Sequence, residues 1–266
     1  MIIKMFCKNK ILQLFTVLIC LIVLIDAAAA FSDIDRNGFC KHITDRTVIV
    51  SVFASDKEAA FNDAKKETEV LGYLDIACKY IKDECKRFGA ETDFIYSNDA
   101  DLVQHECFDT VLSDMTRDTT LIDEYIYSEK SKRQKLLKRY GAHSILYMFY
   151  VNSADDNRES SVCYMWIKDG DPEDEFCVIN TKINGKAEGP AAYAHEILHA
   201  FGAVDLYPDS KSQYEINDLN WCKEDIDKND IMFSVYDIST GEAKYDRITN
   251  SMSETDAYYL GIFLKE

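Results

Sequence analysis

The run SILYMFYV, residues 144–151, constrains the fold of this chain more than any other stretch. A strand with one face in water alternates polar and apolar side chains, whereas this run is apolar at nearly every position. It therefore predicts a strand whose two faces are both covered. Such strands lie at the centre of mostly parallel sheets, so we expect a sheet with helices packed against it.

The segment before this run predicts a strand followed by a long helix. Residues 47–54, TVIVSVFA, are β-branched and apolar enough for a buried strand, and Ser55 with Glu58 matches a capping box at the start of a helix. The helix is expected to end at Gly89, a residue that tolerates the left-handed conformation of a helix end. Its apolar positions recur every three or four residues: Phe61, Ala64, Leu71, Leu74, Cys78, Ile81, Cys85 and Phe88.

The next segments complete an alternating pattern. Residues 92–97 predict a second strand, and residues 120–140 predict a second helix, stopped by Gly141. Residues 162–167 and 176–179 predict two short strands that form a hairpin at the edge of the sheet, joined by the acidic loop 168–175. The predicted class is α+β, with a mostly parallel twisted sheet, an antiparallel edge strand and two long helices.

The amino terminus has the layout of a secretory signal. Lysines precede a strongly apolar run from Ile11 to Ile25, and the small residues Ala28 to Ala30 follow it. The run of fifteen residues is shorter than the roughly 20 that a spanning helix needs. We expect residues 1–30 to be removed, with an uncleaved anchor as the alternative, and residues 31–266 to form one secreted or extracytoplasmic domain that is a monomer and does not contact membrane.

Charge and cysteine content limit the partners and the environment. The net charge is −17, and loss of three lysines and one aspartate with the signal would change it to −19, which argues against binding to nucleic acid. Seven of the nine cysteines would remain, and in an exported protein we expect most of them to form disulfides. Cys163 and Cys177 could close the hairpin, while Cys78 and Cys85 are too far apart along one helix to pair with each other.

The stretch HEILHAFGAVD, residues 195–205, carries the candidate chemistry. Gly189 and Pro190 mark the entry to a helix on which His195 and His199, four residues apart, lie on one face and can bind one metal ion. Gly202 would end this helix abruptly, and the chain could then turn back so that Asp205 offers a carboxylate oxygen to the same ion. Three protein ligands leave a fourth position for water, as in catalytic zinc sites.

Read as HExxHxxGxxD, this stretch resembles the zinc signature of the metzincin clan of metallopeptidases, in its less common form with aspartate as third ligand. That form is similar to the snapalysin-type and immune-inhibitor-A-type peptidases. The clan also has a methionine in a tight turn beneath the metal, and Met232 lies at a plausible distance after Asp205. The resemblance implies an upper lobe, residues 31–201, and a small irregular lower lobe, residues 202–266, with this Met-turn and a carboxyl-terminal helix.

The resemblance also implies a zinc-dependent endopeptidase. His195, His199 and Asp205 would bind one catalytic Zn²⁺, and Glu196 would act as general base on a zinc-activated water. Met232 would form a packing floor under the metal. Tyr236 and Tyr207 are candidates to donate a hydrogen bond to the oxyanion, although a core or surface role is favoured for each. A protein or peptide substrate would lie extended along the edge strand that contains Tyr164 and Trp166.

Several alternatives remain open at the level of sequence. Glu215 or Glu224, instead of Asp205, could supply the third ligand from a later helix. The acidic loop could bind a structural Ca²⁺, although its spacing is not that of an EF-hand and a solvated hairpin tip is favoured. Cys40 could cap the zinc and keep an enzyme latent. The competing function is a catalytically silent secreted binding or inhibitory domain, which would have no physical need for Glu196.

Overall fold

The computed structural model describes residue 40 and residues 42–56, 60–61, 63–97, 99–109, 120–151, 162–168, 171–183, 185–207 and 227–263. All of them lie in one compact unit, Gly38–Glu266. The predicted signal segment lies outside the described residues. Among the helices that the structure describes, none combines the length and the apolar character needed to cross a membrane.

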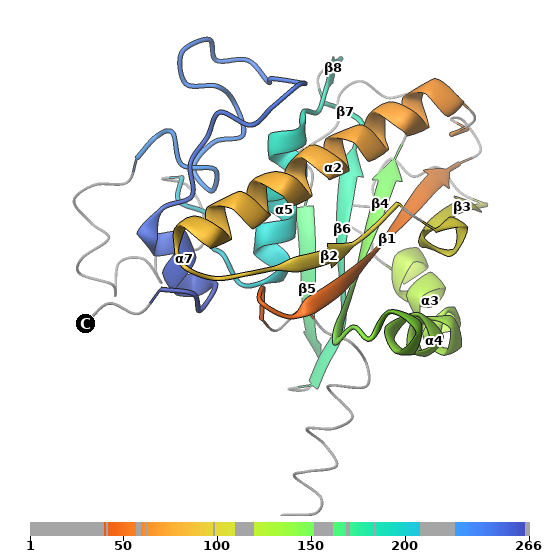
Figure 1. Cartoon of the computed structure of the whole chain (residues 1–266). Coiled ribbons are helices and arrows are strands. Elements are labelled where there is room, and N and C mark those ends of the chain that lie inside the picture. Colours follow the sequence, from red (N-terminus) through yellow and green to blue (C-terminus); the bar gives the residue numbers. More distant parts are fainter. Residues whose placement is uncertain are drawn as a thin grey trace, which may run out of the picture. The chain divides into compact units, whose positions relative to one another are not determined.

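The main sheet has six strands, and five of them follow the order β2-β1-β4-β6-β5 (Figure 1). Strand β1 (Arg46–Ser55) pairs in parallel with β4 on one edge and with β2 and β3 in succession on the other. Strand β4 pairs in parallel with β6, and β5 is antiparallel to β6. The other bounds are β2 Asp93–Ile95, β3 Val103–Cys107, β4 Ser144–Val151, β5 Val162–Lys168 and β6 Asp171–Asn180. The mostly parallel sheet with an antiparallel edge strand is therefore confirmed.

Helices cover both faces of this sheet, which makes the arrangement α/β. Strand β4 is buried along its whole length, as the sequence predicted, because its alternate side chains enter two separate cores. Leu146, Met148 and Tyr150 pack toward α2 (Ala64–Arg87) and α5 (Pro190–Ala200). Tyr147 and Phe149 pack on the opposite face, in the core that includes residues of α3 (Thr120–Ser128) and α4 (Lys130–Tyr140).

The boundaries of the two long helices differ from the prediction. Helix α2 begins at Ala64 with Asp63 as N-cap, so the capping box predicted at Ser55 is wrong. Ser55 is the last residue of β1, and its hydroxyl accepts a hydrogen bond from the Phe61 backbone N–H over 2.7 Å. The second long helix is two shorter ones that meet at Glu129. The turns at Gly89 and Gly141 have positive φ, as expected at helix ends.

Several smaller elements also differ from the prediction. The predicted acidic loop is wrong in extent, because Lys168 belongs to β5 and Asp171–Asn180 is one long strand. Strand β3 and the short 3₁₀ helix η1 (Ala100–Leu102) were not predicted. A second, two-stranded antiparallel sheet joins β7 (Lys182–Ile183) to β8 (Lys186–Ala187) just before α5.

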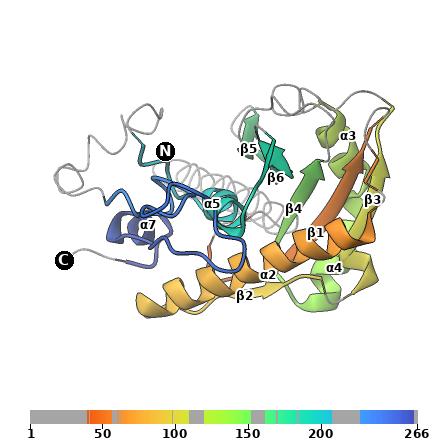
Figure 2. The same ribbon diagram turned by 90° about the horizontal axis from the view of Figure 1, so that it is seen from above.

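The carboxyl-terminal segment, residues 227–263, consists of turns and one short helix, α7 (Glu254–Tyr259). Figure 2 shows α5 between the main sheet and this segment. The buried residues of the carboxyl-terminal segment, Ile231, Met232 and Met252, belong to the same core as α2 and α5. Helix α5 is therefore held from both sides, which fixes the residues that it carries.

Candidate metal centre

Helix α5 begins where the sequence predicted, because Gly189 is its N-cap and Pro190 occupies the first turn. Gly189 is required by close packing and not by its φ of −94°. A Cβ at this position would lie 2.8 Å from the backbone oxygen of Lys244, so only glycine lets the carboxyl-terminal segment approach the helix entry this closely.

The end of α5 is a turn that reverses the chain toward the helix. Gly202 has φ of +100°, in the left-handed region that favours glycine. The Gly202 N–H donates to the His199 carbonyl over 2.9 Å, and the Ala203 N–H donates to the Leu198 carbonyl over 3.1 Å, which is a Schellman motif. The residues after Gly202 consequently run back alongside the last turn of α5.

This reversal brings His195, His199 and Asp205 together. One ligand atom from each lies within 4.8 Å of the others, so the group could hold a metal ion. The Nε2 atoms of the two histidines are 3.0 Å apart, and Asp205 Oδ1 lies 3.3 Å from His195 Nε2 and 3.1 Å from His199 Nε2. The sequence predicted that these three side chains converge, and the distances between them confirm this convergence.

Backbone carbonyls fix which nitrogen of each ring faces the group. His195 Nδ1 lies 3.0 Å from the Ile231 carbonyl, and His199 Nδ1 lies 2.8 Å from the Ala203 carbonyl. A carbonyl can only accept, so each Nδ1 carries the hydrogen and each neutral ring presents an Nε2 lone pair. A proton or a metal ion between them would separate two such lone pairs and a carboxylate, and outer hydrogen bonds of this type are usual for metal-binding histidines.

The interactions within the group shift the pKa values of His195 and Asp205 so that the charged form of each is favoured. Burial lowers the pKa of His195, but the hydrogen bond to Asp205 and the charges of Glu196 and Asp205 outweigh burial and raise it to about 9. The pKa of Asp205 is well below its ordinary range, because the two histidines outweigh the effect of burial. The site therefore favours positive charge at its centre, from a proton or from a metal ion.

Glu196 is buried beside these ligands, with 5% of its surface exposed. Burial raises its pKa, while His195 and His199 act in the opposite direction and a hydrogen bond from the Cys163 backbone also lowers it. Its second carboxylate oxygen, Oε2, has no hydrogen-bond partner among the described residues. A buried carboxylate with an unused oxygen next to metal-binding atoms can accept a proton from a molecule that enters the site.

Met232 lies in a tight turn that is fully buried. Its N–H donates to Asp230 Oδ1 over 2.7 Å, and its carbonyl accepts from the Leu206 N–H over 2.9 Å, next to Asp205. The preceding residue, Ile231, supplies the carbonyl that orients His195. The turn thus supports two of the three ligands by backbone contacts.

The two candidate tyrosines differ in their contacts. The Tyr207 hydroxyl donates to Asp205 Oδ2 over 2.8 Å and leaves Oδ1 facing the histidines. Tyr236 is 44% exposed, and no contact of its side chain with the three ligands is found among the described residues. Burial and the charges of Glu188 and Tyr245 raise the pKa of Tyr236.

Glu188 is a neighbour of the site that the sequence did not reveal. It is 7% exposed, directly before the N-cap of α5. Burial and the charge of Glu196 raise its pKa to about 7, and His195 opposes this shift. A single glutamate before a glycine carries no signal of this proximity, because the proximity arises from the packing of β8 against the helix entry.

Other residues singled out in the sequence lie elsewhere. Glu215 and Glu224 are outside the described residues. Cys40 is buried and its thiol donates to the Ile145 carbonyl over 3.9 Å, so it contacts β4. Cys78 and Cys85 are buried in the core of α2, as small apolar residues would be. Cys163 lies directly opposite Cys177 in the β5–β6 pair, but their thiols are in hydrogen-bonding contact and do not form a disulfide. The expected disulfides are absent among the described cysteines, so this prediction is wrong for that part of the chain.

No family model matches the chain, and no curated protein matches it.

Proposed function

We propose that the chain is an exported zinc-dependent endopeptidase. The proposal rests on the surroundings of Glu196. This carboxylate is buried, and its Oε2 accepts no hydrogen bond among the described residues. It lies beside three side chains that converge and could bind a metal ion. Burying such a group costs free energy, and a purely structural or binding domain would gain nothing from it. Export is inferred from the amino-terminal sequence alone.

The residues divide the chemical work as follows. His195, His199 and Asp205 would hold the ion, and zinc, when bound, supplies a polarised carbonyl and an acidified water. Glu196 takes a proton from the water and later delivers it to the leaving amine, a task that its raised pKa favours. Tyr207 donates its one hydroxyl hydrogen to Asp205, so we assign it to orienting that ligand and leave Tyr236 as the candidate oxyanion donor.

The edge strand provides a place for the substrate. Strand β5 ends the strand order of the main sheet, and the Cys163 backbone donates a hydrogen bond to the Glu196 carboxylate. Strand β5 therefore lies next to the proposed base at this position. An extended peptide that adds main-chain hydrogen bonds to this edge strand would bring its bonds close to Glu196. We therefore propose that the substrates are proteins or peptides. We also propose that the enzyme is a monomer.

The test is a mass-spectrometric profile of cleavage products from a diverse peptide library, with the wild-type chain and a Glu196→Gln variant at equal bound zinc. Glutamine keeps the shape of the side chain and removes its basicity, so we expect internal cleavage by the wild type to fall by about 10²- to 10⁴-fold. Equal cleavage by both proteins would refute the role of Glu196. If neither protein cleaves although both bind zinc, the silent binding domain becomes the better account.

A further inference from the structure

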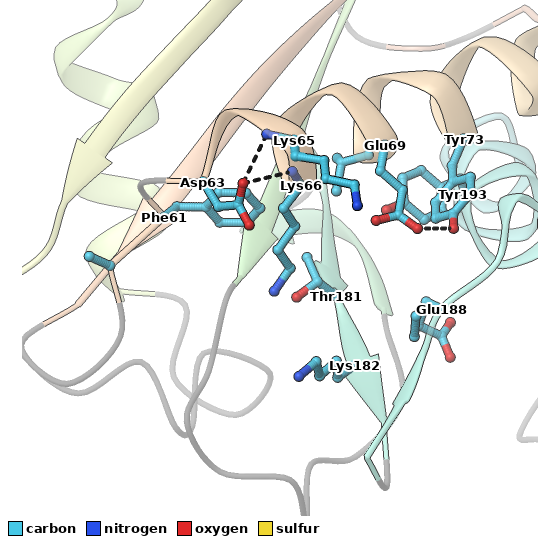
Figure 3. Close-up of a pocket in the computed structure, with 13 residues that line it drawn as sticks. Phe61, Asp63, Lys65, Lys66, Glu69, Tyr73, Thr181, Lys182, Glu188 and Tyr193 are labelled. Carbon is cyan, nitrogen blue, oxygen red and sulfur yellow. Dashed lines mark hydrogen bonds between the residues drawn. The ribbon is translucent and has the colours of Figure 1, made fainter.

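A pocket of about 460 Å³ includes Glu188, the neighbour of the metal-ligand group, but none of its lining residues is one of the proposed metal ligands or Glu196. It opens at the carboxyl end of β6, between the first turns of α2 and the β7–β8 sheet (Figure 3). In sheets with parallel strands and helices on both faces, ligands usually bind outside the carboxyl ends of the strands. The location alone makes this pocket a place to look for a second ligand.

A buried hydroxyl group points into this pocket. Thr181 directly follows β6 and is 6% exposed, and its Oγ1 has no hydrogen-bond partner among the described residues. Figure 3 shows this oxygen directed toward the side chain of Lys66, which descends from the first turn of α2. Buried hydroxyls are almost always hydrogen-bonded, so an unused one that lines a cavity indicates a partner that enters the cavity.

Two lysines reach the same end of the pocket as Thr181. Lys66 comes from α2 and Lys182 from β7. Figure 3 shows both ammonium groups at the end of the pocket where Thr181 lies. Burial and the charge of Lys182 lower the pKa of Lys66, so the two cations repel each other. An anion between them would relieve this repulsion.

Three carboxylates line the pocket, and two of them, Asp63 and Glu69, accept hydrogen bonds and also oppose the lowered pKa of Lys66. Asp63 accepts hydrogen bonds from the Lys65 and Lys66 backbone N–H groups as the N-cap of α2. Glu69 accepts the Tyr73 hydroxyl over 2.6 Å. The third carboxylate, Glu188, is buried and its pKa is raised to about 7, so it carries only part of a negative charge near neutral pH. With Lys65, Lys66 and Lys182, the lining therefore lacks the acidic excess of a chain whose net charge is −17.

We propose that this pocket binds a small molecule through an oxyanion group, a phosphate or a carboxylate, which the Thr181 hydroxyl and the ammonium groups of Lys66 and Lys182 hold together. Both kinds of group accept the same three donors, and charge-assisted hydrogen bonds of this type are strong. The remaining wall includes Val70, Tyr73 and Tyr193, which can pack against the rest of the ligand. This site does not depend on the proposed peptidase activity.

The test measures binding of inorganic phosphate and of succinate to the full chain by titration calorimetry, at fixed ionic strength because salt screens exposed lysines. The variants are Thr181→Val and Lys182→Met. Lys186→Met is the matched control, since Lys186 is also an exposed lysine of the β7–β8 sheet but does not line the pocket. Circular dichroism and the thermal midpoint without ligand confirm that each variant folds.

We expect saturable binding of at least one of the two anions, weakened about tenfold or more in both pocket variants and unchanged in Lys186→Met. A preference for phosphate over succinate, or the reverse, identifies the group that the pocket selects. Should Thr181→Val fail to fold, the exposed Lys182→Met variant decides the result alone. The proposal is overturned if neither anion binds, or if Lys182→Met and Lys186→Met bind them as tightly as the wild type does.

Discussion

Two places in the described part of this molecule bring partly or fully buried acceptor atoms together, and they relieve the repulsion between these atoms differently. Around Asp205, two imidazole lone pairs and a carboxylate oxygen face one another, and the hydrogens of both rings are engaged by backbone carbonyls. Beneath the turn at Met232, the carboxyl groups of Asp230 and Asp256, both fully buried, share a hydrogen bond.

The hydrogen bond between Asp230 and Asp256 requires one of the carboxyls to be protonated, because two carboxylates have no donor. Asp256 also forms a capping box with Ser253, so the pair ties α7 to the turn that supports His195. A shared proton satisfies this pair without any ligand. Around Asp205, a proton on His195, whose pKa is raised to about 9, can also separate the acceptor atoms. One ligand atom from each of three side chains converges there, however, and this geometry is the physical reason to propose a metal at one place and a structural role at the other.

The largest effect is expected at the ligands themselves. Replacing His199 with alanine removes one of three metal-binding atoms, so zinc affinity should fall by more than about 100-fold, beyond the 10- to 100-fold that loss of an outer hydrogen bond costs. Competition with a chromogenic chelator measures the affinity. His143→Ala is the control, because His143 is exposed at the start of β4. Unchanged zinc affinity in His199→Ala would remove the distinction between the two places.

Removal of the Tyr207 hydroxyl tests how the carboxylate is oriented. Tyr207→Phe loses the 2.8 Å hydrogen bond to Asp205, and we expect zinc affinity to fall by about 10- to 100-fold while the thermal midpoint of the metal-free protein changes little. The matched variant is Tyr236→Phe, at a tyrosine of similar exposure. It should keep the zinc affinity and lower only the cleavage rate. The reverse result would exchange the roles assigned to the two tyrosines.

The acid pair predicts a dependence of stability on pH. Burial raises the pKa of both Asp230 and Asp256, so their folded pKa values lie above the unfolded value near 3.9. Their contribution to stability is therefore complete below that unfolded value and is lost as pH rises through the folded values, by up to about 1.4 kcal/mol per pH unit for each proton.

Asp256→Asn mimics the protonated carboxyl and should remove this slope. The measurement is the free energy of unfolding in urea between pH 5 and 8, taken as the difference between wild type and variant so that the titration of His195 cancels. Asp246→Asn, at an exposed position of the same segment, is the control. If the wild type and Asp256→Asn show the same slope, the pair does not share a proton as described.

The sequence predicted the elements whose cause is local. Both faces of the strand 144–151 are apolar, and it is buried on both; the spacing of His195, His199, Gly202 and Asp205 predicted a convergence that the structure contains. The contacts that orient these side chains come from the carbonyls of Ile231 and Ala203, and every residue has a carbonyl, so no residue type could announce them.

The missed features depend on contacts between distant segments. The start of α2 was misplaced because Ser55 uses its hydroxyl to bind the Phe61 N–H across a turn, a contact that competes with a helix cap. Strand β3 is polar at several positions and is held by pairing with β1, so its own sequence gives little sign of a strand. The pocket beside Thr181 combines α2 with the β7–β8 sheet, which no single stretch of sequence encodes.

The smallest expected effect concerns the turn that brings Asp205 back to the histidines. Gly202 has φ of +100°, and a Cβ there would lie 3.5 Å from the Tyr259 carbonyl, an ordinary contact, so Gly202→Ala should cost about 1 to 2 kcal/mol through backbone strain and not through a clash. Gly72→Ala is the matched control: Gly72 lies inside α2 with open space around it, and the same change should stabilise the protein by about 0.5 to 1 kcal/mol. Urea unfolding of both variants checks the signs.

Since the strain lies in the turn and not in the ligands, Gly202→Ala should weaken zinc binding less than Tyr207→Phe does. A larger loss of zinc would mean that the turn, more than the hydrogen bond from Tyr207, determines where Asp205 lies.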